Sequence, residues 1–242
     1  MTTTEVAAIV HGLPVTIVHK DIKHLHLAVY PPDGRVRIAV PEGVSDQAVH
    51  ATIAARLPWI RHQQASFQRQ ERETVREMVS GETHWFNGRR FRLRIAETRA
   101  KPTVTLAGGD VMELQVSPGA TAEDRRALLD RWYRERLREQ VPALLDRWAG
   151  VVGVERPDWR VRHMRTRWGS CRTGSRRIWV NLELAKKPRR HLEYIVVHEL
   201  IHLAIRHHDA AFQARLDQLM PHWQQLRSEL GALPLGHERW PD

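Results

Sequence analysis

Short apolar and alternating runs dominate the first 118 residues, a pattern typical of β-strands. Turn-forming residues separate the runs in pairs, at Pro32-Asp33-Gly34, Asn87-Gly88 and Gly108-Gly109-Asp110. Each pair of runs is therefore expected to form a hairpin. The runs are Leu25–Tyr30 with Val36–Val40, His84–Phe86 with Arg90–Ile95, and Thr103–Leu106 with Val111–Val116; Val15–Val18 precedes them.

One long helix is expected among these strands, from Ser45 to about Glu77, with Ser45 as its N-cap. Trp59 and Ile60 are its predicted buried anchors. The clearest boundary in the chain is Ser117-Pro118-Gly119. No internal repeat of solenoid length and no low-complexity tract interrupts this pattern. The sequence thus predicts a region over residues 1–118 and a second one over 119–242.

The second region has the pattern helix, hairpin, helix, helix. Thr121 is the expected N-cap of the first helix, whose apolar stripe continues at three- and four-residue spacing to Trp148, past a Pro142 that can kink it. The later elements are strand-like segments at Trp159–Trp168 and Ile178–Leu184 around the turn Thr173-Gly174-Ser175, a helix over about Arg190–Arg206, and a helix capped by Asp209 that ends at Met220. The predicted fold class is α+β, with a β-rich N-terminal region and a helical C-terminal domain that carries a short hairpin.

The composition is that of a globular chain, with 42% hydrophobic and 27% charged residues among 242. Cys171 is the single cysteine, so an intramolecular disulfide and any zinc site built on several cysteines are excluded. No run approaches the ~20 apolar residues of a membrane span, and Glu5, His11 and Pro14 do not suit a signal peptide. We expect a soluble cytoplasmic protein without a membrane partner.

The formal net charge is +10, with a pI of about 10.7, which would attract the protein to nucleic acid or acidic surfaces. Seven arginines and no acid lie between Arg160 and Arg177, interleaved or flanked by Trp159, Trp168 and Trp179. This segment is a candidate surface for single-stranded nucleic acid, because arginines hold phosphates and aromatic rings stack on bases. The alternative interpretation is a solvated strand face that binds nothing.

The string His198-Glu199-Leu200-Ile201-His202 has the spacing of a metal site on a helix. Four residues advance a helix by about 400°, so the imidazoles of His198 and His202 can bind one ion from one side. Glu199 lies about 100° around the helix from His198, where a carboxylate can take a proton from metal-bound water. The apolar residues around the motif favour this interpretation over two ordinary helix histidines with an exposed glutamate.

A hydrolytic zinc site usually has a third protein ligand and one open position. His208 is the main candidate, but on a continued helix it would point about 80° away from the metal face. The chain must therefore turn near Arg206, and an N-cap at Asp209 is consistent with a turn there. The rival third ligands are His207, Asp217 and Glu229.

At this point the sequence resembles the YgjP-like (DUF45) family of zinc metallopeptidases, related to the SprT-like and WLM peptidases. The C-terminal third carries the resemblance most specifically, and weaker similarity extends over most of the chain. Three positions depart from the family pattern, with His207 in place of Asn, Asp209 in place of Ser and Val180 in place of Leu. The matching residues are Thr166-Arg-Trp-Gly-Ser-Cys171, Ile178-Trp-Val-Asn181, Tyr194, His198-Glu-Leu-Ile-His202, His208, Phe212 and Met220-Pro221.

The resemblance implies a zincin-like catalytic domain with His198, His202 and His208 as Zn²⁺ ligands and Glu199 as general base. The implied activity is that of a zinc metalloendopeptidase acting on peptides or proteins by a zinc-activated water. A sheet edge beside the metal helix, at Arg176–Leu184 or Thr166–Ser170, would pair with an extended substrate.

Four residues near this site have an open role. Arg167 and Trp168 are candidate substrate-binding residues, and the alternative for both is packing that fixes the hairpin on the helix. Cys171 can be a zinc-capping thiolate or a small hydrophobic residue. Tyr194 can be a core residue or an oxyanion donor.

Two other functions compete with the peptidase. One is a basic nucleic-acid-binding protein with a structural or vestigial zinc, or a DNA-associated protease that combines both activities. The other is a non-catalytic interaction module that uses residues 1–118.

Overall fold

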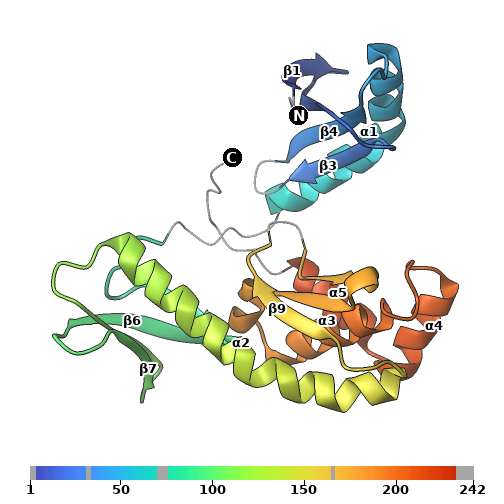
Figure 1. The fold of residues 1–242 in the computed structure, drawn as a ribbon. Coiled ribbons are helices and arrows are strands. Elements are labelled where there is room, and N and C mark those ends of the chain that lie inside the picture. Colours follow the sequence, from blue (N-terminus) through green and yellow to red (C-terminus); the bar gives the residue numbers. More distant parts are fainter. Residues whose placement is uncertain (1–3, 31–33, 70–75, 165–166, 233–242) are drawn as a thin grey trace. The chain divides into compact units, whose positions relative to one another are not determined.

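The computed structural model describes residues 4–30, 34–69, 76–164 and 167–232. Its contacts divide the chain into two compact units, Met1–Glu73 and Thr74–Asp242 (Figure 1). The first unit is a four-stranded sheet of order β1-β2-β4-β3, followed by a helix. Its elements are β1 (Thr4–Val10), β2 (Leu13–Lys20), β3 (His26–Tyr30), β4 (Arg35–Pro41) and α1 (Asp46–Arg69).

The predicted hairpin of the first unit is confirmed, and the predicted helix is present but shorter. It ends at Arg69, and Arg76 and Glu77 at the end of the predicted range are not helical. β3 and β4 pair antiparallel, although Pro32 and Asp33 of their predicted turn lie outside the described residues. Ser45 caps α1, since its hydroxyl accepts a hydrogen bond from the Ala48 amide at 3.3 Å. Ile60 is fully buried, as predicted. The prediction for Trp59 is wrong: it lies about 100° around the helix from Ile60, and 40% of its surface is exposed.

The second unit begins with another four-stranded sheet, of order β5-β6-β8-β7. Both predicted hairpins are present, and the Asn87-Gly88 turn has the positive φ values, 48° and 79°, that suit these residue types. The long helix α2 (Ala122–Val152) follows, and its N-terminus is a capping box between Thr121 and Asp124. The strands are β5 (Thr83–Phe86), β6 (Arg89–Glu97), β7 (Thr103–Ala107) and β8 (Val111–Val116).

The two four-stranded sheets share one topology. In each, two antiparallel hairpins join through a central parallel pair, β2 with β4 or β6 with β8, and a long helix follows. Corresponding features keep a spacing of 76 positions: the first turns are His11-Gly12 and Asn87-Gly88, and the helix caps are Ser45 and Thr121. The chain therefore contains a structural repeat of a ββββα unit, which is much longer than a solenoid repeat.

This division of the chain differs from the predicted one after residue 118. The second sheet shares a hydrophobic core with α2 and the elements after it, from Met78 to Leu230. A cut after residue 118 would separate buried side chains such as Leu93 and Leu114 from the helix that covers them. The contact boundary therefore lies before the second sheet, at Glu73 and Thr74.

The C-terminal part has three short strands, of order β10-β11-β9, and three helices. Of the predicted strand Trp159–Trp168 only the first part is a strand, β9, and a further strand, β10, follows at Gly169–Arg172. β9 pairs parallel with β11, and β10 pairs antiparallel with it. The predicted helix to Arg206 is shorter, because it ends at Ile201. The elements are β9 (Asp158–Arg162), β10 (Gly169–Arg172), β11 (Arg177–Asn181), the 3₁₀ segment η2 (Leu182–Lys186), α3 (Arg189–Ile201), α4 (Ala210–Leu219) and α5 (Trp223–Ala232).

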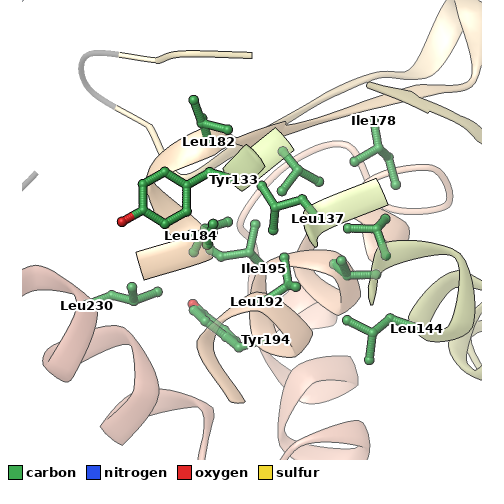
Figure 2. Close-up of a cluster of buried hydrophobic side chains, with 14 of the residues drawn as sticks. Tyr133, Leu137, Leu144, Ile178, Leu182, Leu184, Leu192, Tyr194, Ile195 and Leu230 are labelled. Carbon is green, nitrogen blue, oxygen red and sulfur yellow. The ribbon is translucent and has the colours of Figure 1, made fainter. Parts of the chain in front are cut away.

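A continuous hydrophobic core fixes α3 in the second unit (Figure 2). Side chains from α2, such as Leu137 and Leu144, lie beside Leu192 and Ile195 of α3 and Leu184 of η2. Val196, Val197, Leu200 and Ile201 of α3 are fully buried. Tight packing of this kind leaves the helix little freedom to rotate, so the side chains on its remaining face have defined positions.

The secondary structure contains helices and sheets throughout, in agreement with the predicted α+β class. Within the described ranges, no helix combines the length and apolar composition that a membrane crossing needs.

Candidate metal centre

Three histidines converge at the end of α3. His198 and His202 lie one turn apart, as their spacing predicts, and His208 reaches them from the segment before α4. The Nε2 atoms of His198 and His202 are 3.2 Å apart, and the Nε2 atom of His208 lies 3.0 Å from each. The structure therefore brings together the three histidines that the sequence analysis selected.

The turn that delivers His208 comes earlier than the sequence indicates. Beyond Ile201 the chain leaves the helix through tight turns, in which Leu203 and Ala204 donate to carbonyls three residues back. Asp209 then caps α4, because its carboxylate accepts a hydrogen bond from the Phe212 amide at 3.0 Å. No glycine or proline marks this break, which explains why the sequence places it near Arg206.

The rival third ligands lie elsewhere. Asp217 accepts a hydrogen bond from the Trp223 indole at 2.7 Å, and Glu229 binds Arg190 and His191. Among the described residues, the cluster that can hold a metal ion contains His208 and not His207.

The donor set fits a zinc ion. Zn–N bonds of about 2.05 Å at tetrahedral angles separate the nitrogens by about 3.3 Å, close to the distances found here. The Nδ1 of His202 lies 3.1 Å from the carbonyl oxygen of Ile205, which places the ring proton on Nδ1 and leaves Nε2 with its lone pair. The Nε2 atoms of all three rings face one another at these distances, as they would around one bound cation.

The electrostatics of the cluster favour the neutral imidazoles that bind metals. Burial, and then the charge of His202 and His208, lower the pKa of His198 to about 3. Burial lowers the pKa values of His202 and His208 as well. Protons therefore compete weakly for these nitrogens at neutral pH.

Aromatic packing orients the ring of His198. Its Nδ1 is buried and has no hydrogen-bond partner within the described part of the chain. The rings of Phe212 and Tyr194 lie at 4.9 and 5.9 Å from it, between centroids. Tyr194 is itself almost fully buried, and burial raises the pKa of its hydroxyl, which agrees with a core position.

Glu199 is a buried carboxylate beside the three histidines, with 5% of its surface exposed. The hydrogen bonds and ion pairs found among the described residues do not include its carboxylate. Burial raises its pKa to about 8, and the charge of Arg167 opposes this shift. A dication next to it would favour the ionised form, as opposite charges do.

Gly169 makes room for this carboxylate, a role that the sequence analysis did not assign. A Cβ at this position would lie 2.6 Å from Oε1 of Glu199 and 2.7 Å from Cγ2 of Ile195. The signal was a glycine inside a strand-like segment, which often marks a close approach of another group to the backbone.

Asn181 is a second residue whose role only the structure shows. It is fully buried, and its amide nitrogen donates to the carbonyl oxygens of Met164 and Arg167 at 2.8 and 2.7 Å. Its backbone amide donates to the carbonyl of Trp168 at 2.9 Å. Asn181 thereby holds the segment that leads into β10 and Gly169.

The two candidate substrate-binding residues differ in position. Arg167 is exposed and acts on Glu199 through its charge. Trp168 is partly buried against the core, and the Nζ atom of Lys187 lies 5.7 Å from its ring. Substrate binding by either residue stays a prediction.

Cys171 lies outside the histidine cluster. Burial, and then the neighbouring Glu199, raise the pKa of its thiol to about 11. It therefore stays protonated at neutral pH, as a small core residue would.

Comparison with known proteins gives one family assignment. Residues 23–232 match the family described as "YgjP-like, metallopeptidase domain", so the chain belongs to the YgjP-like metallopeptidases and is a metallopeptidase. No curated protein matches the chain. Among solved structures, it is similar to the crystal structure of the metallopeptidase zymogen of Pyrococcus abyssi abylysin, with 20% identity and a TM-score of 0.35 over 37% of this chain and 90% of that chain.

Proposed function

We propose that the protein is a zinc-dependent endopeptidase in which His198, His202 and His208 hold the ion and Glu199 is the general base. The observation that carries this proposal is the convergence of three imidazole Nε2 atoms beside a buried carboxylate without a structural partner. That combination is typical of hydrolytic zinc sites, which have three protein ligands and one open position.

The chain's own residues supply the proton transfer and the orientation. When bound, zinc supplies a Lewis acid that makes water a better nucleophile at neutral pH and polarises the scissile carbonyl. A Glu199 carboxylate oxygen accepts the proton of the attacking water and delivers it to the leaving amine nitrogen. The fixed packing of α3 and the close contact with Gly169 hold this carboxylate in place.

An extended substrate would pair with β10. This strand lies at the edge of its sheet, whereas β11 is paired on both sides, with β10 and β9. The predicted edge at Arg176–Leu184 is therefore interior over β11, which leaves the other predicted edge, Thr166–Ser170, for pairing. Thr166 lies outside the described residues, and Gly169 and Ser170 belong to β10. Backbone pairing of this kind tolerates many side chains.

The proposal is tested by measuring zinc content and peptide cleavage in three proteins. These are the wild type, Glu199→Gln, and the control Glu97→Gln, which changes an exposed residue of β6. We expect one zinc per chain in all three proteins. Cleavage of a denatured protein should fall by about 100-fold or more in Glu199→Gln, the usual contribution of a general base, and stay unchanged in the control. A zinc-loaded Glu199→Gln protein that cleaves at the wild-type rate would contradict the mechanism.

A further inference from the structure

A groove of about 540 Å³ lies on the outer face of the β10-β11-β9 sheet. Its volume is in the range of sites that hold small ligands or a few side chains. It is rich in arginine and has an aromatic wall. Its lining includes Arg162, Met164, Arg167, Ser170, Arg172 and Trp179.

Strand alternation places these side chains on one face. In β10, Ser170 and Arg172 point away from the core, whereas Gly169 and Cys171 face it. Trp179 of β11 lies opposite Ser170 in the register, so it projects to the same side as the arginines. The outer face is therefore continuous across all three strands.

The positive charge of this face is not neutralised within the described residues. Neighbouring arginines have acidic partners, such as Arg177 with Asp158 at 2.6 Å and Arg176 with Glu155 at 3.5 Å. Arg162, Arg167 and Arg172 have none among the ion pairs of the described chain. His163 also lines the groove, and it pairs with Asp130 at 3.1 Å.

The groove and the candidate metal centre share strand β10, on its opposite faces. Ser170 lines the groove, and the preceding residue, Gly169, faces the Glu199 side chain, which a Cβ at Gly169 would approach to 2.6 Å. A peptide paired along β10 would place every second side chain on the outer face, beside Arg172 and Trp179. The intervening side chains would point toward α3.

From these observations we infer that the arginine groove selects acidic peptide substrates, with Glu or Asp at alternate positions of the bound segment. This inference rests on the proposed function. Guanidinium groups bind carboxylates through paired, charge-assisted hydrogen bonds, and Trp179 offers an apolar surface to the side-chain stem. Position favours a peptide over nucleic acid, because β10, which lines the groove, is the edge strand proposed to pair with the substrate.

The test measures binding of two ten-residue peptides, one with alternating Glu and Thr and one with alternating Gln and Thr. They are titrated into zinc-loaded Glu199→Gln protein, which would bind a substrate without cleaving it. We expect the Glu peptide to bind about tenfold or more tightly, the effect of one or two charge-assisted hydrogen bonds. In the double variant Arg162→Gln/Arg172→Gln, the ratio of the two peptide affinities should fall to about 2 or less. The matched control Arg92→Gln on β6 should keep the wild-type ratio.

Three results would overturn the inference: equal affinity for the two peptides, a preference that survives in the double variant, or tighter binding of a ten-nucleotide single strand with the same arginine dependence. The last would indicate a nucleic-acid surface instead. If the double variant fails to fold, Arg172→Glu replaces it, and we expect that variant to prefer a Lys peptide over the Glu peptide. The zinc content and cleavage activity of the wild type distinguish failure of the proposed function from failure of this inference alone.

Discussion

Single residues determine the geometry of the candidate centre. Gly169 lets the backbone of β10 approach Glu199, Asn181 holds the segment that leads into β10, and Phe212 packs against the ring of His198. Each of these residues acts by placing another one. The chemistry of the site thus depends on close packing around the helix as well as on the metal-binding motif.

Replacing Gly169 by Ala should impair both stability and activity. The new methyl group would lie 2.6 Å from the Glu199 carboxylate and 2.7 Å from Ile195, so β10 or Glu199 must shift. We expect a loss of about 1–3 kcal/mol in the free energy of unfolding, as for other overpacked sites, and a reduced cleavage rate with zinc still bound. Urea denaturation and zinc analysis measure these effects.

Gly174→Ala is the matched control, since a Cβ there meets open space. An equal loss of stability in both variants would show that the contact with Glu199 is unimportant.

The adjacent histidines His207 and His208 allow a direct test of the third ligand. His208→Ala should weaken zinc binding strongly, because its Nε2 atom lies 3.0 Å from those of the other two histidines. His207→Ala should bind zinc like the wild type, because its side chain lies outside the cluster. Competition with a chelating dye gives both affinities, and the reverse order would assign the ligand to His207.

At the scale of elements, the cap of α4 couples folding to the metal centre. Asp209 holds the start of α4 and directly follows His208. Asp209→Ala should therefore cost about 1 kcal/mol in the free energy of unfolding, as for other lost caps, and also lower the zinc affinity.

Thr121→Ala, which removes the cap of α2, provides the comparison. It should cost a similar amount of stability and leave zinc affinity unchanged. If both variants lose zinc to the same extent, the effect reflects general destabilisation.

Local patterns identified most elements, because hairpin turns, helix caps and apolar stripes are encoded within a few residues. The capping box at Thr121 and the turn at Asn87-Gly88 are examples. The parallel pairing of β9 with β11 has no local signal, since β10 lies between these two strands in the sequence. The position of the turn after Ile201 has no local signal either, because no glycine or proline marks the end of α3.

The site shows the same contrast between local and long-range information. The spacing of His198, Glu199 and His202 determines their relation on α3 from the sequence alone. The approach of His208 and the role of Gly169 depend on how other segments pack against that helix. The sequence alone does not exclude Asp217 and Glu229 as ligands. In the structure they bind other residues, Trp223 and His191.

At the scale of the whole molecule, buried histidines make stability depend on pH. Burial lowers the pKa values of His84 and His191, despite their bonds to Glu82 and Glu229. Below the ordinary histidine pKa of about 6.5, the unfolded chain takes up protons that these folded side chains do not. The free energy of unfolding should therefore fall as the pH decreases from 7 to 5.5.

Urea denaturation of zinc-free protein across this range measures the slope, to which the three histidines of the metal centre also contribute through their lowered pKa values. His191→Asn should flatten it, whereas His222→Asn, at an exposed position, should not. A slope of opposite sign, or one that His191→Asn leaves unchanged, would contradict this explanation.

Two repeats of one ββββα unit have different surroundings in this chain. In the second, the Asn87-Gly88 turn packs on η2 and Pro188, with the Asn87 and Gly88 amides donating to Ala185 and Lys186. In the first, a Cβ on Gly12 at the corresponding turn would meet nothing within 4 Å. The second repeat is thus part of the scaffold of the metallopeptidase core.

The most direct test of the proposed centre is anomalous diffraction at the zinc edge from crystals of the zinc-loaded protein. We expect one strong peak within about 2.1 Å of the Nε2 atoms of His198, His202 and His208, without a fourth protein ligand. A peak at another position, no peak, or a fourth side chain such as the Cys171 thiolate on the ion would contradict the proposed hydrolytic site.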